Sequence, residues 1–180
     1  MYRKPVVMAV MAIVCSMVAV ERGVAYEIGH LSRAFFDSSR NRNIDVEIFY
    51  PAATAGDDVP VAVGVFPVIA FGHGYTIPWS DYEYCWERLS AGGYIFCLSD
   101  TESGLLPDHL DFGRDLAFIL GAMQAAGGAP GDVFYQHVAS ASALMGHSMG
   151  GGACFLGAQY ATGLTTLVNL AAAETNPSAV

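Results

Sequence analysis

Basic residues are scarce in this sequence. It has 8 Lys and Arg against 17 Asp and Glu, which gives a net charge of -9 at pH 7. Because contacts with phosphate need a surface of lysine and arginine, this balance argues against a nucleic-acid partner. Long charge runs, repeats and linker-like segments are also missing. The whole 180-residue chain is 53% hydrophobic with 20 glycines, which predicts one globular domain with a buried core.

Metal-binding and disulfide patterns are lacking as well. The five histidines form no HxxxH pattern and the cysteines no CxxC pattern, so we expect no metal site. Beyond the N-terminal segment there are three cysteines, Cys85, Cys97 and Cys154, which cannot all pair within the chain. Cys97 and Cys154 lie in apolar stretches, where a thiol usually packs. A Cys85–Cys97 disulfide stays open as an alternative.

The N-terminal apolar run, Pro5–Val20, is shorter than the ~20 residues that a helix needs to cross a bilayer. Two basic residues precede it, and Gly23-Val24-Ala25 supplies small residues before a cleavage site after Ala25. We therefore predict a cleaved signal peptide at 1–25 and a secreted or periplasmic domain at 26–180, with no stable membrane span after cleavage. An uncleaved membrane anchor is the alternative.

Strand and helix patterns alternate along the rest of the chain. The expected strands are 30–36, 44–52, 66–74, 94–100, 141–146 and 165–173, and the expected helices are 81–93, 109–128 and 151–161. Ser80 and Glu83 predict a capping box before the first helix, and Asp108 predicts a cap for the second. The alternation predicts an α/β fold, an open and mostly parallel sheet with helices on both faces and functional residues where strands end.

Residues 146–150 read G-H-S-M-G, a G-x-S-x-G motif between an expected strand and an expected helix. This is the setting of a nucleophile elbow, in which a serine occupies a strained turn. Gly146 and Gly150 avoid side-chain clashes in such a turn, and the following helix directs free N–H groups at the site. The motif predicts Ser148 as a nucleophile; a structural serine is the alternative.

A second motif, FGHGYT at 71–76, ends an earlier strand, where the oxyanion loop of such a sheet belongs. A developing oxyanion needs two N–H donors, and we expect them from the backbones of Met149 and Tyr75. We expect the ring of His73 to brace this loop rather than to act in catalysis. His147 is expected to point away from the nucleophile, as a packing or hydrogen-bonding residue.

These motifs, with NIDVEIFYPA at 43–52 and LSAGGYIFCLSDT at 89–101, resemble secreted α/β-hydrolases of the dienelactone-hydrolase, chlorophyllase and platelet-activating-factor acetylhydrolase type. The GYT turn and the G-x-S-M-G-G-G elbow are especially similar to those of bacterial cutinases and polyester hydrolases. The resemblance covers residues 44–180. It implies an α/β-hydrolase fold and a serine esterase that acts on a small-molecule or polymeric ester without a cofactor.

The resemblance also implies residue roles. Ser148 is the implied nucleophile and attacks an ester carbonyl to form an acyl-enzyme, with Met149 and Tyr75 as backbone oxyanion donors. Tyr75 and Trp79 are implied beside the acyl pocket, although a structural role for Trp79 is equally open. The aromatic residues Tyr82 and Trp86 are expected to extend this apolar groove.

The sequence departs from the family after the nucleophile. Family members carry their triad in the order Ser, Asp, His, but no Asp or His follows Ser148. Glu174 is the one downstream acid, and His109 and His137 lie at neither expected triad position. The sequence therefore predicts an incomplete domain that lacks its last strands and is inactive as it stands. The alternatives are a catalytically silent binding module, or a thioesterase or acyltransferase on the same elbow.

Overall fold

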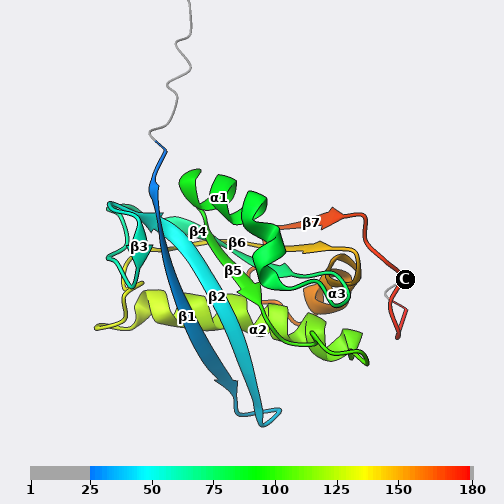
Figure 1. The fold of residues 1–180 in the computed structure, drawn as a ribbon. Coiled ribbons are helices and arrows are strands. Elements are labelled where there is room, and N and C mark those ends of the chain that lie inside the picture. The colour runs from blue at the N-terminus through cyan, green and yellow to red at the C-terminus, as the bar shows by residue number, and fades with distance from the viewer. Residues whose placement is uncertain (1–24, 179–180) are drawn as a thin grey trace, which may run out of the picture.

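The fold is built on one mixed sheet, which the computed structural model describes within residues 25–178. Seven strands lie in the order β3-β1-β2-β5-β4-β6-β7. The strands are β1 (Glu27–Asp37), β2 (Arg42–Ala52), β3 (Gly56–Asp57), β4 (Phe66–Gly72), β5 (Ile95–Ser99), β6 (Val138–His147) and β7 (Thr166–Leu170). The predicted α/β class is confirmed (Figure 1). The predicted signal peptide, except for Ala25, lies outside the described residues.

Three α-helices and one 3₁₀ helix connect the strands. They are η1 (Trp79–Tyr82), α1 (Glu83–Ala91), α2 (His109–Gly128) and α3 (Met149–Ala158). The strands β5, β4, β6 and β7 run parallel, whereas β2 pairs antiparallel with both β1 and β5. The predicted strands at 30–36 and 44–52 are confirmed: they lie in β1 and β2, which form a hairpin in which Glu27 pairs with Ala52 and Asp37 with Arg42.

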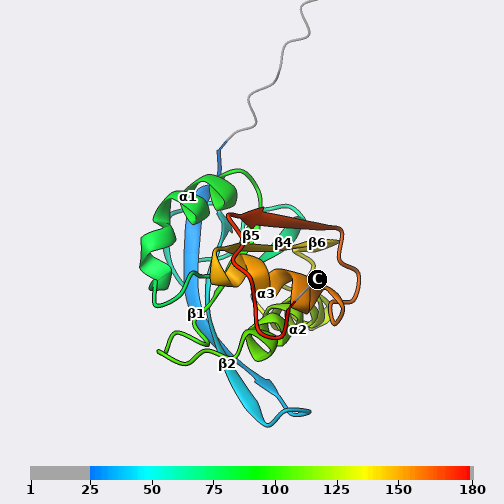
Figure 2. The same cartoon turned by 90° about the vertical axis from the view of Figure 1, so that its right-hand side faces the viewer.

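Each face of the sheet has its own apolar layer. On one face Phe96 and Leu98 of β5 pack with residues of η1 and α1. On the other face Ile95 and Cys97 pack against α2 and α3, as alternation along a strand requires. Figures 1 and 2 show α1 on the opposite side of the sheet from α2 and α3. Helices therefore cover both faces, as the sequence predicts.

The predicted capping box at Ser80 is wrong. The chain enters α1 through η1, Ser80 lies inside that 3₁₀ turn, and Tyr82 stands at the cap position of α1 without a capping side-chain hydrogen bond. Tyr82 is 2% exposed, so its burial against Phe71 and Phe96 fixes this entry in place of a polar cap. The end of α1 agrees with the prediction, because Gly92 caps it and Gly93 has a φ of 95°.

Asp108 caps α2 as predicted: its carboxylate accepts hydrogen bonds from the N–H groups of Leu110 and Asp111, both at 2.9 Å. The helix then crosses α3 at close range, because Gly113 and Gly157 face each other without side chains. A methyl group on Gly113 would lie 2.6 Å from the carbonyl oxygen of Ala153. Small residues at this crossing let α3, and with it the turn before α3, sit close to the sheet.

An ionic cluster joins the β1–β2 hairpin to α2. Asp115 of α2 has a fully buried side chain, which accepts from Nε and Nη2 of Arg42 at 2.8 to 3.0 Å and lies 2.7 Å from Nη2 of Arg40. The hydroxyl of Thr101 donates to the same carboxylate at 2.6 Å, and Arg42 also donates to Glu102 at 2.6 Å. Hydrogen bonding to Asp115 is the main cause that raises the pKa of Arg42, so this cation stays charged inside the cluster.

The cysteines of the described residues are free thiols. Cys85, Cys97 and Cys154 are all buried and unpaired, so the structure contains no Cys85–Cys97 disulfide. Burial raises the pKa of the Cys154 thiol to about 12 and also raises that of Cys97, which keeps both thiols protonated and unreactive. Within the described range, each helix is too short or too polar to serve as a membrane span.

His30 of β1 ties the three strands at one edge of the sheet together. Its Nε2 lies 2.7 Å from Glu47 of β2, and its Nδ1 lies 2.9 Å from Asp57 of β3. The ring also stacks on Phe49 with centroids 4.6 Å apart. Burial lowers the pKa of His30, but the hydrogen bonds and negative charges of Asp57 and Glu47 raise it by more, so its pKa lies above the ordinary 6.5.

Replacing His30 with glutamine is expected to destabilise the protein more at about pH 6 than at about pH 9. A pKa raised by folding gives stabilisation that is complete below the unfolded pKa and is lost as pH rises through the folded pKa. The free energy of unfolding lost at about pH 6 should be about 1 kcal/mol or less, since the pairs of His30 with the two carboxylates are partly exposed. Urea unfolding at the two pH values measures this free energy. Ser32→Ala is the control, because this hydroxyl binds the same Glu47 carboxylate without titrating; equal pH dependence of both variants would contradict the prediction.

Candidate functional site

Ser148 occupies a sharp turn between β6 and α3, as the motif predicts. Its φ is 51° and its ψ is -114°, a conformation that a residue with a side chain adopts only under strain. The surrounding main chain holds it there. The N–H of Ser148 donates to Leu170 at 2.9 Å, and its carbonyl accepts from Gly152 at 3.0 Å and Ala173 at 2.8 Å.

The elbow has no room for a side chain at the positions of its two glycines. A methyl group on Gly146 would overlap the main chain of Gly150, and one on Gly150 would overlap the carbonyl group of Gly72. Both overlaps involve backbone atoms, which cannot rotate away. Glycine at these two positions therefore lets the turn lie directly on the end of β4, in agreement with the sequence interpretation of Gly146 and Gly150.

The turn after β4 lies beside the elbow. The N–H of Gly150 donates to the carbonyl of His73 at 3.0 Å, which fixes the two loops to each other. Within residues 25–178, the N–H groups of Met149 and Tyr75 have no hydrogen-bond acceptor. Met149 also begins α3, so the positive end of the helix dipole adds to its N–H. The two N–H groups that the sequence predicts as oxyanion donors therefore lie on adjoining turns.

Tyr82 braces the oxyanion turn, a role that the sequence interpretation missed. Its hydroxyl accepts from the N–H of Gly74 at 2.7 Å and shares a hydrogen bond of 3.0 Å with Nδ1 of His147. Burial raises the pKa of Tyr82, so the hydroxyl keeps its proton. The interaction agrees with the hydrogen-bonding role expected for His147. It could not be read from the sequence, because Tyr82 fits a helical apolar stripe equally well.

None of the five histidines, all of which lie in the described part of the chain, forms a hydrogen bond with Ser148. His73 is fully buried with Nδ1 2.8 Å from the carbonyl of Gly74 and Nε2 2.9 Å from that of Thr101, so it braces the loop as expected. His109 accepts from the N–H of Asn176 at 3.0 Å. His137 contacts Gly64 at the other end of β6, roughly 30 Å from the elbow at ~3.3 Å per strand residue.

The remaining predicted site residues lie around the elbow at different depths. Glu174 is exposed and directly follows Ala173, the residue that binds the Ser148 carbonyl, so it is near the elbow but pairs with no histidine in the described residues. The ring of Trp79 packs at a tilt against that of Phe49, with the ring centroids 6.0 Å apart. Tyr82 is buried and Trp86 stacks flat on Phe49 at 4.2 Å. Both rings belong to the apolar layer beneath α1. Tyr82 is buried there, which corrects its expected place in an open groove, whereas Trp86 is half-buried.

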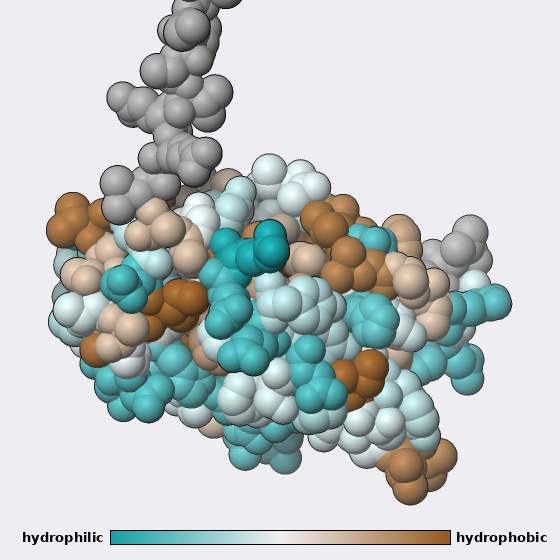
Figure 3. Space-filling model, turned by 45° about the horizontal axis from the view of Figure 1, so that its top comes forward, coloured by the Kyte–Doolittle hydropathy of each residue, from teal (hydrophilic) through white to brown (hydrophobic). Residues whose placement is uncertain are grey.

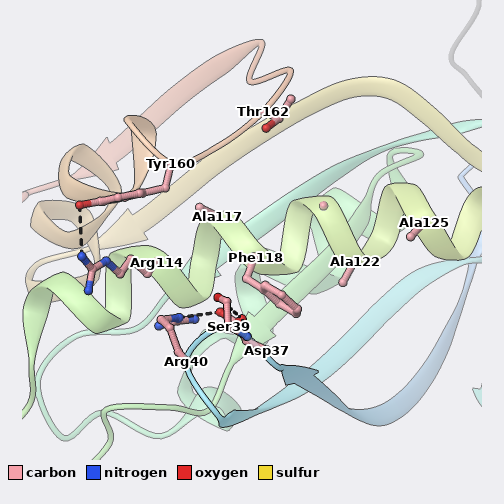
Figure 4. A pocket seen from close by; sticks show the side chains of 11 residues that line it. Asp37, Ser39, Arg40, Arg114, Ala117, Phe118, Ala122, Ala125, Tyr160 and Thr162 are labelled. Atoms are coloured by element: carbon pink, nitrogen blue, oxygen red, sulfur yellow. Dashed lines mark hydrogen bonds and ion pairs between the residues drawn. The ribbon is translucent and has the colours of Figure 1, made fainter.

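A cavity of about 700 Å³ lies elsewhere, between α2, the hairpin turn and the segment after α3 (Figure 4). Its two cations already have partners. Arg40 donates to Asp37 at 2.6 Å, and Arg114 lies over the ring of Tyr160, 5.0 Å from its centroid. Burial raises the pKa of Asp37, but hydrogen bonds from Ser39 and Arg40 lower it by more, to about 2. The cavity includes no elbow or oxyanion-turn residue.

Comparison with known proteins does not identify a family for this chain. No protein-family model matches this chain, and a search of curated proteins finds no significant match. No cluster of three metal-ligating side chains occurs within residues 25–178. The geometry around Ser148, an oriented serine with two adjoining N–H donors at the C-terminal edge of the sheet, is therefore the basis for assigning a function.

Proposed function

We propose that the protein is a serine hydrolase of the α/β-hydrolase superfamily that acts on carboxylic esters through an acyl-enzyme at Ser148. The main-chain conformation of Ser148 carries this proposal. A half-buried serine is held at a φ of 51° between the C-terminal end of β6 and the N-terminus of α3. Strain of this kind costs roughly 1–3 kcal/mol and persists where the surrounding structure enforces it, which is typical of a functional residue.

The N–H groups of Met149 and Tyr75 supply the second half of the chemistry. When the serine oxygen attacks an ester carbonyl, negative charge develops on the carbonyl oxygen, and two N–H donors without other acceptors stabilise it. The ester C–O bond then breaks and the alcohol leaves with the proton that Ser148 has lost. Water next cleaves the acyl-enzyme, which releases the acid and returns a proton to Ser148. Losing one such donor typically slows turnover by roughly 10²–10³-fold. The bond between Gly150 and His73 supports this role, because it keeps the two donor turns in register.

An activity-based probe tests the proposal without knowledge of the substrate. The protein is expressed from its complete reading frame, treated with an organofluorophosphonate and digested, and the labelled peptide is identified by mass spectrometry. We expect the label on Ser148, because the probe reacts with an activated serine. Ser148→Ala should abolish labelling with an unchanged melting temperature, whereas Ser80→Ala, which removes an exposed serine of η1, should leave it intact. Labelling of another serine would refute the assignment, and absence of labelling would favour a silent binding module.

A further inference from the structure

His73 is a basic side chain in the interior of the protein. On the face drawn in Figure 3, hydrophilic side chains are spread over the surface, where water solvates their charges. Among the described residues, the acidic and basic side chains that are buried instead are Asp37, Asp115 and His73. Arginines donate hydrogen bonds to both aspartates. The His73 ring receives no such side-chain partner among the described residues, because its two hydrogen bonds go to main-chain atoms.

Both ring nitrogens of His73 face carbonyl oxygens. Nδ1 lies 2.8 Å from the carbonyl of Gly74, and Nε2 lies 2.9 Å from the carbonyl of Thr101. A carbonyl oxygen only accepts hydrogen bonds, whereas a neutral imidazole has one N–H donor and one acceptor nitrogen. A neutral ring would therefore set a nitrogen lone pair against a carbonyl lone pair, at hydrogen-bond distance and away from water. An imidazolium, with a proton on each nitrogen, satisfies both carbonyls.

The surroundings of the ring also favour its cationic form. The ring of Phe112 on α2 packs against it with centroids 4.9 Å apart, and aromatic rings attract cations. Asp100 directly precedes Thr101 and supplies a negative charge. Burial is the main cause that raises the pKa of Asp100, and the positive charge of His73 lowers it against that effect. A second carboxylate, Asp115, binds the hydroxyl of Thr101 at 2.6 Å.

The titratable groups on the elbow side of the turn are engaged with each other. The hydroxyl of Tyr82 accepts from the N–H of Gly74 and shares a hydrogen bond with Nδ1 of His147. Neither side chain is hydrogen-bonded to the ring of His73. The carboxylates on the Thr101 side are therefore the counter-charges of the ring.

The contact with Gly74 sets the direction of a proposed oxyanion donor. The carbonyl of Gly74 and the N–H of Tyr75 belong to one trans peptide group, so they point in opposite directions. Nδ1 of His73 and the N–H of Ile77, at 3.1 Å, hold this carbonyl and thereby fix the direction of the Tyr75 N–H. Because hydrogen bonds in a chain polarise one another, a cationic donor on the carbonyl also makes the N–H of the same peptide a stronger donor.

We propose that His73 is a buried imidazolium that acts as a positioning residue. It donates a proton from each ring nitrogen, and through the carbonyl of Gly74 it directs the N–H of Tyr75 toward the developing oxyanion. The positioning role rests on the proposed ester hydrolysis at Ser148, whereas the protonation state of the ring does not.

Nitrogen NMR of the histidine rings tests the protonation state. The protein from the complete reading frame is labelled with ring-¹⁵N histidine and studied at about pH 8, where an ordinary histidine is neutral. We expect two protonated ring nitrogens for His73, whose signals are assigned by their loss in His73→Gln. His137, which contacts a single carbonyl, should show one protonated and one unprotonated nitrogen in the same spectrum. An unprotonated nitrogen on His73 at this pH would overturn the proposal.

Asp100→Asn tests the charge without altering the buried ring. Asp100 is exposed, so the variant should fold like its parent. Loss of a nearby negative charge disfavours a cation, so His73 should lose its second proton in less basic solution than in the parent protein. Glu87→Gln is the control, because it removes an exposed carboxylate from α1, on the other face of the sheet. If both variants left the His73 signals unchanged, charge would not stabilise the ring.

Steady-state kinetics distinguish positioning from a merely structural role. His73→Gln keeps a hydrogen-bond donor but carries no charge. It should lower kcat for p-nitrophenyl acetate roughly 10²-fold, close to the loss of one oxyanion donor, with KM within about twofold. His137→Gln removes a similar carbonyl contact at the far end of β6 and should leave both constants within about twofold. A raised KM at unchanged kcat, or equal losses in the two variants, would refute the positioning role.

The two proposals fail in different ways. A doubly protonated His73 together with an unlabelled Ser148 would support the buried cation and refute the hydrolase. A labelled Ser148 together with an unprotonated nitrogen on His73 would support the hydrolase and refute the buried cation.

Discussion

Replacing Asp115 with alanine is expected to lower the free energy of unfolding by roughly 3–5 kcal/mol, which approaches the whole stability of many domains. The carboxylate is fully buried and receives hydrogen bonds from Arg42 and Thr101 as well as the charge of Arg40. Its removal takes a negative charge away from Arg40 and Arg42, at a place that is partly shielded from water. Urea denaturation followed by tryptophan fluorescence measures the loss.

Asp111 provides the comparison within the same helix. It lies one turn before Asp115, is 35% exposed, and contacts Arg40 and Arg114 at 3.6 and 3.4 Å. Because exposed pairs contribute little, Asp111→Ala should cost less than about 1 kcal/mol. If the two aspartate variants lost equal stability, burial would not be what makes the cluster strong.

A second large effect is expected from Gly150→Ala. The added methyl group would overlap the carbonyl of Gly72 and would push the elbow off β4, breaking the hydrogen bond between Gly150 and His73. Overpacking of backbone against backbone with a lost hydrogen bond should cost roughly 3 kcal/mol or more. Fluorophosphonate labelling of Ser148 should be lost as well, since the oxyanion donors separate. Thermal unfolding and labelling of the same sample measure both effects.

Gly121→Ala is the control for Gly150→Ala, because it makes the same substitution away from the elbow. Gly121 lies inside α2, and no atom outside its own helix turn is within 4 Å of the place where its methyl group would go. Alanine is the better helix former, so this change should raise stability by up to about 1 kcal/mol. Destabilisation by both substitutions would show that the close approach at Gly150 is not the cause.

Features set by neighbouring residues were predictable from the sequence. Alternating apolar residues indicated the β1–β2 hairpin, continuous apolar runs indicated β4 and β5, and Asp108 indicated the start of α2. The turn at Ser148 was predictable because two glycines at fixed spacing between a strand and a helix leave few other conformations. In each case the physical cause lies within a few residues, where a sequence pattern can express it.

Features set by distant partners were not predictable. Ser80 met the rule for a helix cap, but the burial of Tyr82 against the sheet moved the start of α1 past it. Arg42 and Asp115 are 73 residues apart, and nothing near either one indicates the other. The sequence offers no triad acid or base beyond the candidate acid Glu174, and in the structure Glu174 is exposed and no histidine among the described residues binds Ser148.

The place of β5 in the sheet has a consequence for folding during synthesis. The hairpin of β1 and β2 is local and can pair once residue 52 has left the ribosome, and β4 comes later in the chain. Yet β2 and β4 are not neighbours, because β5 lies between them and binds both. The edge of β2 and the edge of β4 that will face β5 therefore stay unpaired and exposed to other chains until Ile95–Ser99 emerges from the ribosome. Insertion of this one strand then satisfies both edges at once and joins the N-terminal hairpin to the part of the sheet that will carry Ser148.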